Sequence, residues 1–490
     1  MLKMKLNKEY KWIIGAAILM RIIAVIFSPG YGMHDDHFLI IESSSSWADG
    51  SDYNNWLPWS EGNAGHPEGH SFTYVGLNFI YFYCMKLIGV VDPKILMFFN
   101  RLIHALVSMF VVVYGIKTAE KLANVKQAKI VGWLLAVLWI IPFLSVRNLV
   151  ESAAIPFLVW GVWLLVREKN GRDFLWAGLV IGFAVSFRYQ IGVFALGVAA
   201  IYFFRFQWKA FSFFCSGVLA MFILTQGLVD FLIWGYPFAE LWAYITYNMN
   251  EGTAYLPNTN YFMYFYVLIG VFFVPLGFLM LFGFFKSWKK YALLFVPTII
   301  FILFHSLYPN RQERFILTIL PIFLILGVLG YDLLSESKRK HKIWNSSWIA
   351  FWVLNIPFLL FASTMYSKKS RVEAMYSING NGMKNELILL EGSSSNKVSM
   401  LPRFYANDWS ISTTDRTDST MNWKINDTLG YDYIFFFDEQ NLVKRINESK
   451  KEYPKMTLVK QCEPSLLDKL LRTLNPRNSN EYIEVWKTNE

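Results

Sequence analysis

Charged residues are scarce in this chain, and cysteine is almost missing. Of its 490 residues 17% are charged and 54% are hydrophobic, whereas a soluble protein carries roughly a quarter charged residues. This composition excludes a disordered chain and an ordinary soluble enzyme. The three cysteines provide no disulfide framework. The many aromatic residues, 43 Phe, 26 Tyr and 19 Trp, must therefore face something other than water, and lipid is the simplest candidate.

The basic surplus lies almost wholly in the hydrophobic part of the chain. The sequence carries 46 Lys and Arg against 36 Asp and Glu, a net charge of +10. Residues 367–490 contain 18 basic and 17 acidic residues, so the first 366 residues hold +9 of that surplus. Cytoplasmic loops of membrane proteins are rich in Lys and Arg. The surplus therefore indicates membrane topology, and we expect no nucleic-acid partner.

Apolar segments suitable for crossing a membrane recur along the first 366 residues. The hydrocarbon core is about 30 Å thick and needs about 20 residues of helix. The sequence predicts eleven spans, at residues 11–29, 95–116, 130–146, 150–166, 173–187, 190–204, 211–233, 261–285, 291–308, 315–333 and 344–366. The first of these has no small-x-small cleavage site after it, so it is interpreted as a retained helix and not as a signal peptide.

The apolar segment 72–91 decides the topology. If it crosses the membrane, the basic clusters after it fall outside; if it is re-entrant or interfacial, they all fall on the cytoplasmic face. We therefore predict eleven spans plus one non-spanning helix, with a cytoplasmic N-terminus. The external parts are then a first loop at 30–94, a second loop at 234–260, and the whole tail.

The tail after residue 366 has the pattern of a small soluble domain. Four runs with strand character, at 397–405, 431–437, 456–464 and 482–487, accompany one helical stretch at 464–474. The fold class is therefore mainly α, with a membrane domain at 1–366 and an external α/β domain at 367–490.

An acidic segment, HDDHFLIIE at residues 34–42, follows the first expected span. Adjacent carboxylates at a membrane interface suit a general base on an acceptor hydroxyl, or oxygen ligands for a divalent metal. An equally weighted alternative is a helix start with Asp as the N-cap. The weak candidates for metal ligands are Asp35, Asp36, His37, His66 and His70.

A second polar segment, NRQERF at residues 310–315, separates two expected spans. The planar guanidinium of arginine suits phosphate, and Arg311 and Arg314 lie where a lipid headgroup would be. Generic anchoring of headgroups, with Glu313 pairing a neighbouring arginine, is the alternative. From the residues alone the two interpretations are equal.

Together these motifs resemble the GT-C superfamily of membrane glycosyltransferases. The resemblance is to the glycosyltransferase family 22 branch, which contains the α-mannosyltransferases that use dolichyl- or polyprenyl-phosphate-mannose. DDHFLIIE keeps that branch's spacing of acidic residues after the first span. Three further segments are similar in the same order, at residues 187–194, 229–252 and 310–321.

The resemblance implies a role for each matching residue. Asp35 is implied as the catalytic base, with Asp36 and Glu42 orienting the acceptor or a metal. Arg314 is implied to hold the lipid phosphate, assisted by Arg311. The residues implied to line the site are Arg188, Asp230, Tyr236 and Asn248.

The implied reaction is inverting transfer of a sugar, mannose or another hexose, from a polyprenyl-phosphate donor to a hydroxyl of a glycan or lipid-linked acceptor. No cofactor is expected to be required, although a divalent metal stays possible. The expected location is the bacterial inner membrane, in contact with membrane lipids. Two rival functions stay open, a lipid or sugar carrier and an oligosaccharide ligase or polymerase that uses a lipid-pyrophosphate donor.

Overall fold

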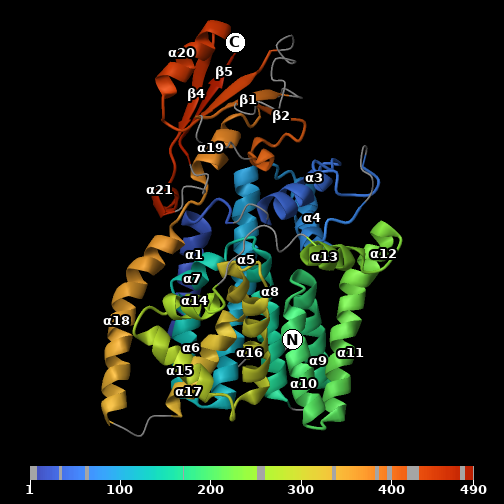
Figure 1. Cartoon of the computed structure of the whole chain (residues 1–490), viewed down its shortest axis with the longest axis vertical. Coiled ribbons are helices and arrows are strands. Elements are labelled where there is room, and N and C mark those ends of the chain that lie inside the picture. The colour runs from blue at the N-terminus through green and yellow to red at the C-terminus, as the bar shows by residue number, and fades with distance from the viewer. Residues whose placement is uncertain are drawn as a thin grey trace. The chain divides into compact units, whose positions relative to one another are not determined.

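The computed structural model of the chain contains two compact units (Figure 1). The structure describes residues 8–32, 36–60, 66–168, 170–250, 260–333, 338–380, 386–393, 400–416, 430–474 and 481–488. Unit 1 comprises Met1–Val25, Asn55–Gly76 and Arg101–Thr364. Unit 2 comprises Ile26–Asn54, Leu77–Asn100 and Met365–Glu490. The tail is thus joined in one unit by two segments from the first hundred residues.

Unit 1 is a bundle of helices that run side by side (Figure 1). Its main helices are α6 (Val125–Val137), α7 (Ile140–Leu144), α8 (Val150–Arg167), α9 (Gly171–Phe187), α10 (Ile191–Phe204), α11 (Trp208–Phe222), α12 (Leu228–Trp234), α13 (Ala239–Asn250), α14 (Met263–Val271), α15 (Leu276–Lys286), α16 (Ala292–Leu307), α17 (Leu320–Asp332) and α18 (Lys338–Ser363). A π-helical segment η3 (Ile223–Gly227) joins α11 to α12, and a 3-10 segment η4 (Glu313–Ile319) precedes α17. Helices α1 (Lys11–Phe27), α4 (Phe72–Leu87) and α5 (Pro93–Leu122) have residues in both units.

Every one of the eleven expected spans coincides with helix, so the mainly α prediction is confirmed. Among the described residues, six helices are long and apolar enough to cross a membrane, or seven if one bent pair counts as a single span. Others, such as α10 and α16, are apolar but shorter. The exact number of spans and the non-spanning role of 72–91 stay predictions.

The expected span at 261–285 is broken in the structure. Helices α14 and α15 meet at 118° instead of continuing. Phe273 has a left-handed backbone with φ +55°, and Pro275 has no N–H to donate to a preceding turn. The sequence pattern missed this break because both halves are equally apolar.

Close helix packing in unit 1 depends on glycine. A Cβ built on Gly330 of α17 would lie 1.8 Å from the carbonyl oxygen of Gly283 on α15. A Cβ on Gly178 of α9 would lie 2.2 Å from the carbonyl oxygen of Phe214 on α11. Only a residue without a side chain allows these backbones to approach, which is a common device in membrane bundles.

Unit 2 contains a five-stranded mixed sheet. Its strands are β1 (Leu387–Glu391), β2 (Ser412–Asp415), β3 (Tyr433–Phe437), β4 (Thr457–Cys462) and β5 (Ile483–Lys487), in the order β2-β1-β3-β5-β4. Strand β1 is parallel to β2 and β3, whereas β5 is antiparallel to β3 and β4. Helix α20 (Leu442–Glu452) packs on one face, where Leu442 and Ile446 contact the cluster containing Ile434 and Phe436 (Figure 1).

Most of the expected tail elements are present. Strands β3, β4 and β5 and helix α21 (Leu466–Leu474) fall where the sequence predicted them. The strand expected at 397–405 is wrong for its described part, 400–405, because a 3-10 turn η5 (Arg403–Ala406) follows Pro402 there. Proline cannot donate to a sheet ladder, which disfavours a strand at this point. Strands β1 and β2 and helix α20 were not predicted.

Candidate functional site

The acidic segment of unit 2 forms a π-helix η2 (His37–Glu42) followed by α3 (Ser43–Ala48). Asp36 precedes η2, is 6% exposed, and makes no side-chain capping hydrogen bond. Asp36 therefore stands at the N-cap position, as the capping interpretation expected, but its side chain does not cap η2. Asp35, the expected base, and His34 lie outside the described residues. The acids beside them are buried, which is costly unless they have partners.

His37 is held between aromatic rings. Its ring stacks on Tyr31, with centroids 4.3 Å apart, and on Tyr405, with centroids 5.8 Å apart. Its Nε2 lies 3.5 Å from Oε1 of Glu42, and both side chains are fully buried. Burial raises the pKa of the Tyr31 hydroxyl, so this ring stays neutral. These contacts fix the position of the His37 ring, and His37 follows Asp36 directly in the chain.

The tail supplies further contacts to this segment. The backbone N–H of Phe404 in η5 donates to Oε1 of Glu42 at 3.2 Å. Trp409 donates from Nε1 to Oδ2 of Asp49 at 2.7 Å, and Lys86 forms an ion pair with the same carboxylate at 2.6 Å. The tail and the acidic segment, far apart in sequence, therefore share one packed environment within unit 2.

Unit 1 contains a separate cluster of arginines around one buried carboxylate. Glu151, in the first turn of α8, is 0% exposed. Its Oε1 lies 3.1 Å from Nη2 of Arg188 and 3.7 Å from Nε of Arg314. The Arg188 guanidinium also lies 4.7 Å from the ring centre of Phe315. The predicted phosphate-binding Arg314 and the predicted lining residue Arg188 are thus brought together by a residue to which the sequence assigned no role.

Arg311 lies in the same η4 corner but has different partners. It is 5% exposed, donates from Nε to the carbonyl of Ser306 at 2.8 Å, and stacks 4.5 Å above the Tyr261 ring. Its Nη1 is buried without a hydrogen-bond partner in the described part of the chain. A buried guanidinium nitrogen without an acceptor is costly, so it favours an anionic ligand at this position.

Asp230 belongs to a hydrogen-bond network between the end of the expected span 211–233 and the second expected loop. Its Oδ2 accepts from the backbone N–H of Glu240 at 3.0 Å, and Gln226 donates to its Oδ1 at 2.8 Å. Glu240 in turn accepts from Nε1 of Trp56 at 3.1 Å and from the backbone N–H of Gly69 at 2.7 Å. The network fixes the segment 55–76 to α12 and α13 within unit 1.

The last two predicted lining residues differ in environment. Asn248 donates to the carbonyl of Tyr244 at 2.7 Å and accepts at Oδ1 from the Tyr308 hydroxyl at 3.1 Å. Tyr236 is 47% exposed in the turn after α12. The structure therefore ties Asn248 to its own helix α13 and to the end of α16, and leaves Tyr236 at the surface of unit 1.

The expected metal ligands do not form a cluster in the described residues. No group of three or more His, Cys, Asp or Glu side chains suited to a metal was found there. His66 lies 3.6 Å from a carboxylate oxygen of Glu68, with both side chains exposed, and the His70 ring lies 6.1 Å from Trp56. Asp35 lies outside this search.

A sequence profile shows to which protein family the chain belongs. The profile of the Alg9-like mannosyltransferase family matches residues 12–392. The chain belongs to this family. It is an integral membrane glycosyltransferase, as the GT-C resemblance of its motifs implied. No curated protein sequence matches this family member significantly.

Solved structures share the fold of this mannosyltransferase-family chain. ArnT from Cupriavidus metallidurans bound to undecaprenyl phosphate is 11% identical over 97% of both chains, with a TM-score of 0.63. The oligosaccharyltransferase of Archaeoglobus fulgidus, in complex with Zn and sulfate, is 12% identical over 89% of this chain and 69% of its own, with a TM-score of 0.55. The fold is therefore of the GT-C type.

Three site residues were missed by sequence reasoning. Glu151 and Glu240 carry a weak signal, since each is an acid at the beginning of an apolar helix. Tyr405 carries none, because it lies beyond residues 12–392, where the family profile matches, and in a segment predicted as a strand. Its contact with His37 depends on the tertiary fold alone.

Proposed function

We propose that this enzyme transfers a hexose, most simply mannose, from a polyprenyl-monophosphate donor to a hydroxyl of a glycan or lipid-linked acceptor. The observation that carries the proposal is the pairing of Arg188 and Arg314 with the buried carboxylate Glu151, together with the buried Arg311 three residues before Arg314. These charges leave an excess of positive charge in a largely buried environment. Such an excess favours a phosphate dianion as ligand.

The proposed reaction follows from these groups. The bond between the sugar's anomeric carbon and the phosphate oxygen breaks, and a bond from the acceptor oxygen forms on the opposite face. A carboxylate of the acidic segment, with Asp35 as the candidate, takes the acceptor proton. Arg314 and Arg188 stabilise the polyprenyl phosphate that leaves. Because the arginines supply this stabilisation, the proposal requires no metal.

Two comparisons support a polyprenyl-phosphate partner. ArnT was solved with undecaprenyl phosphate, and AglB from Archaeoglobus fulgidus with dolichol-phosphate and an inhibitory peptide. AglB is 11% identical over 90% of this chain and 71% of its own, with a TM-score of 0.52. We propose that this chain also binds a polyprenyl phosphate. Two acids of the acidic segment, Asp36 and Glu42, are proposed to orient the acceptor. The residues proposed to line the site are Asp230, Tyr236 and Asn248.

The donor class is tested with purified protein and defined lipids. Polyprenyl-monophosphate-mannose and polyprenyl-pyrophosphate-linked sugars are supplied side by side, and products are read by mass spectrometry. We expect transfer from the monophosphate donor, falling about 100-fold in Arg314→Gln. Arg167→Gln is the matched control. Arg167 lies at the opposite end of α8 from Glu151, and it pairs with Asp173 of α9. Transfer only from the pyrophosphate donor would favour a ligase or polymerase instead.

The proposed topology places the N-terminus in the cytoplasm of a bacterium and the domain at 367–490 outside the inner membrane. A cysteine-free variant carrying Lys451→Cys on α20 tests it, because Lys451 is exposed. We expect labelling of this cysteine from outside intact spheroplasts. Lys121→Cys, at the end of α5, is the counterpart that should stay protected.

A further inference from the structure

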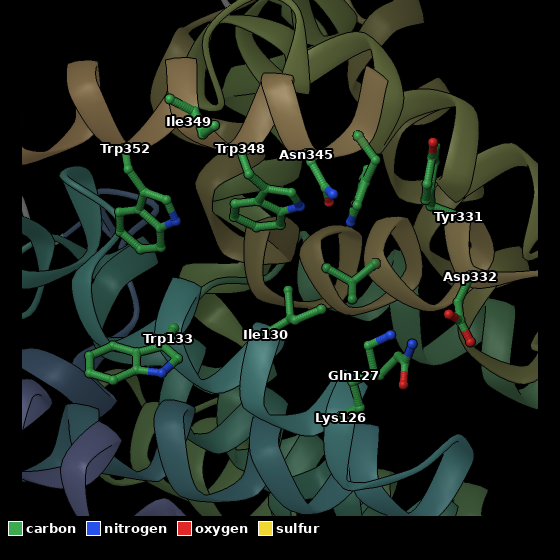
Figure 2. A pocket seen from close by; sticks show the side chains of 12 residues that line it. Lys126, Gln127, Ile130, Trp133, Tyr331, Asp332, Asn345, Trp348, Ile349 and Trp352 are labelled. Carbon is green, nitrogen blue, oxygen red and sulfur yellow. The ribbon is translucent and has the colours of Figure 1, made fainter. Parts of the chain in front are cut away.

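A cavity of about 510 Å³ lies between helices α6, α17 and α18 of unit 1 (Figure 2). Figure 2 shows Trp348 and Trp352 of α18 and Trp133 of α6 facing the same space. None of these residues belongs to the motifs used for the proposed function.

On two helices the polar lining residues precede most of the apolar ones, and Trp344 and Tyr331 add aromatic rings at the polar end. On α6 the lining runs from Lys126, in the first turn, to Trp133. On α18 it runs from Asn345 to Trp352. Each pair spans about 10 Å of helix. Asp332, the last residue of α17, lines the same polar end. Both charged lining residues therefore lie at one end of the cavity, which matches a lipid with its headgroup there and its chain toward the middle of the bundle.

The polar end has unmatched groups of both signs. Lys126 and Asp332 form no ion pair with each other or with another side chain in the described ranges. Gln127 is 3% exposed, and its Oε1 has no hydrogen-bond partner among the residues that the structure describes. A buried acceptor without a donor is costly. The Gln127 oxygen is itself enclosed, so the cavity offers one cation for a phosphate and one carboxylate for a hydrogen-bond donor.

The aromatic wall is already ordered. Trp344 stacks on Tyr331 with ring centroids 3.9 Å apart, and Trp348 lies 5.4 Å from Trp344 and 6.1 Å from Trp352. Tryptophan is favoured at the boundary between headgroups and acyl chains. Rings fixed by stacking lose little side-chain entropy when a chain packs against them.

We propose that this cavity binds a phospholipid with a primary-amine headgroup. The phosphate accepts from Lys126. The ammonium donates to Asp332, and one acyl chain follows Ile130, Trp133 and Trp348. This site is independent of the arginine cluster, because Asp332 and Arg314 lie near opposite ends of the 20-residue span Glu313–Asp332.

The test is native mass spectrometry of the purified full-length protein. It is mixed with equal amounts of phosphatidylethanolamine, phosphatidylglycerol and phosphatidylcholine that have identical acyl chains. We expect phosphatidylethanolamine to be retained at least about 5-fold more than the other two, as one charge-assisted hydrogen bond predicts. Asp332→Asn should abolish that preference, and Lys126→Gln should lower retention of all three lipids. Lys121→Gln on α5 is the control that should change neither.

Three results would overturn the proposal. They are equal retention of the three lipids, a preference for phosphatidylglycerol, and a preference for phosphatidylethanolamine that survives Asp332→Asn. Both substituted residues are exposed at helix ends, so the variants are expected to fold. Unchanged unfolding temperatures check this directly.

Discussion

At the scale of single residues, the arginine cluster depends on Glu151. This carboxylate is fully buried and lies within 3.7 Å of both Arg188 and Arg314. In a buried environment, removing one partner of an ion pair leaves the other charge uncompensated. Glu151 therefore acts as the counter-ion of the cluster while no phosphate is bound.

Glu151→Gln keeps the shape of the side chain and removes its charge. We expect it to destabilise the protein by about 3 kcal/mol, within the range for breaking a buried ion pair. Polyprenyl phosphate should restore the variant's unfolding temperature more than it raises that of the wild type, because it replaces the lost negative charge. A thermal-shift series with added lipid measures both. Equal shifts in the two proteins would contradict a phosphate ligand here.

Arg314→Lys tests the geometry of the same cluster. Lysine keeps the charge but loses the planar set of donors that suits a phosphate. We expect sugar transfer to fall about 10-fold, with the KM for the donor rising more than kcat falls. Initial rates at varied donor concentration separate these effects. Unchanged kinetics would contradict donor-phosphate binding by Arg314 and would favour the alternative, generic anchoring of a lipid headgroup.

At the scale of elements, the acidic segment is shaped by the tail. The turn η5 places Tyr405 on the ring of His37 and the N–H of Phe404 on Glu42. The π-helix η2 is an unusual local conformation, which such contacts help to hold. The tail therefore positions the segment that contains the candidate base.

Tyr405→Ala removes one side of the His37 stack. We expect transfer activity to fall about 10-fold and the free energy of unfolding to fall by about 3 kcal/mol, as for other buried aromatic truncations. Tyr405→Phe, which keeps the ring, should retain most of both. Loss of activity in both variants would instead assign the role to the hydroxyl. Rates and unfolding curves of the two purified variants provide the comparison.

The sequence predicted where individual helices and motifs lie better than it predicted which segments contact each other in the fold. Helical periodicity and apolar length predicted helix at each of the eleven expected spans, and the motif order singled out Arg188 and Arg314, which the structure places on one carboxylate. The pairing of both arginines with Glu151 was not predictable, because it depends on how α8, α9 and η4 pack. Likewise, 362 residues separate Glu42 from Phe404. A single sequence shows local hydrophobic periodicity and composition. It does not show which distant elements contact each other in the folded protein.

At the scale of the whole molecule, unit 2 is assembled from separate segments by ion pairs. Glu373 accepts from Lys94 at 2.8 Å and from Lys460 at 2.7 Å, and the Tyr366 hydroxyl donates to it at 2.7 Å. Burial alone would raise the pKa of Glu373, but the hydrogen bonds from the two lysines and Tyr366 lower it to about 2. This carboxylate joins the segment Leu77–Asn100 to the tail.

The lowered pKa of Glu373 predicts a pH dependence. A carboxylate whose pKa is lower in the folded state stabilises the fold above its unfolded pKa of 4.5, and this stabilisation is lost as the pH falls toward about 2. We expect Glu373→Gln to cost about 2 kcal/mol at pH 7 and much less at pH 3. Unfolding of both proteins at the two pH values measures the difference. A constant difference would contradict the ion-pair network.

The interleaved order of the two units also has a consequence for biosynthesis. A ribosome makes Ile26–Asn54 and Leu77–Asn100 before the segment Arg101–Thr364 of unit 1, and makes their companion Met365–Glu490 after it. The membrane helices of unit 1 can therefore insert while the acidic segment still lacks the residues that enclose it. A nascent chain of this enzyme is expected to stay catalytically silent until the segment after residue 364 has been made.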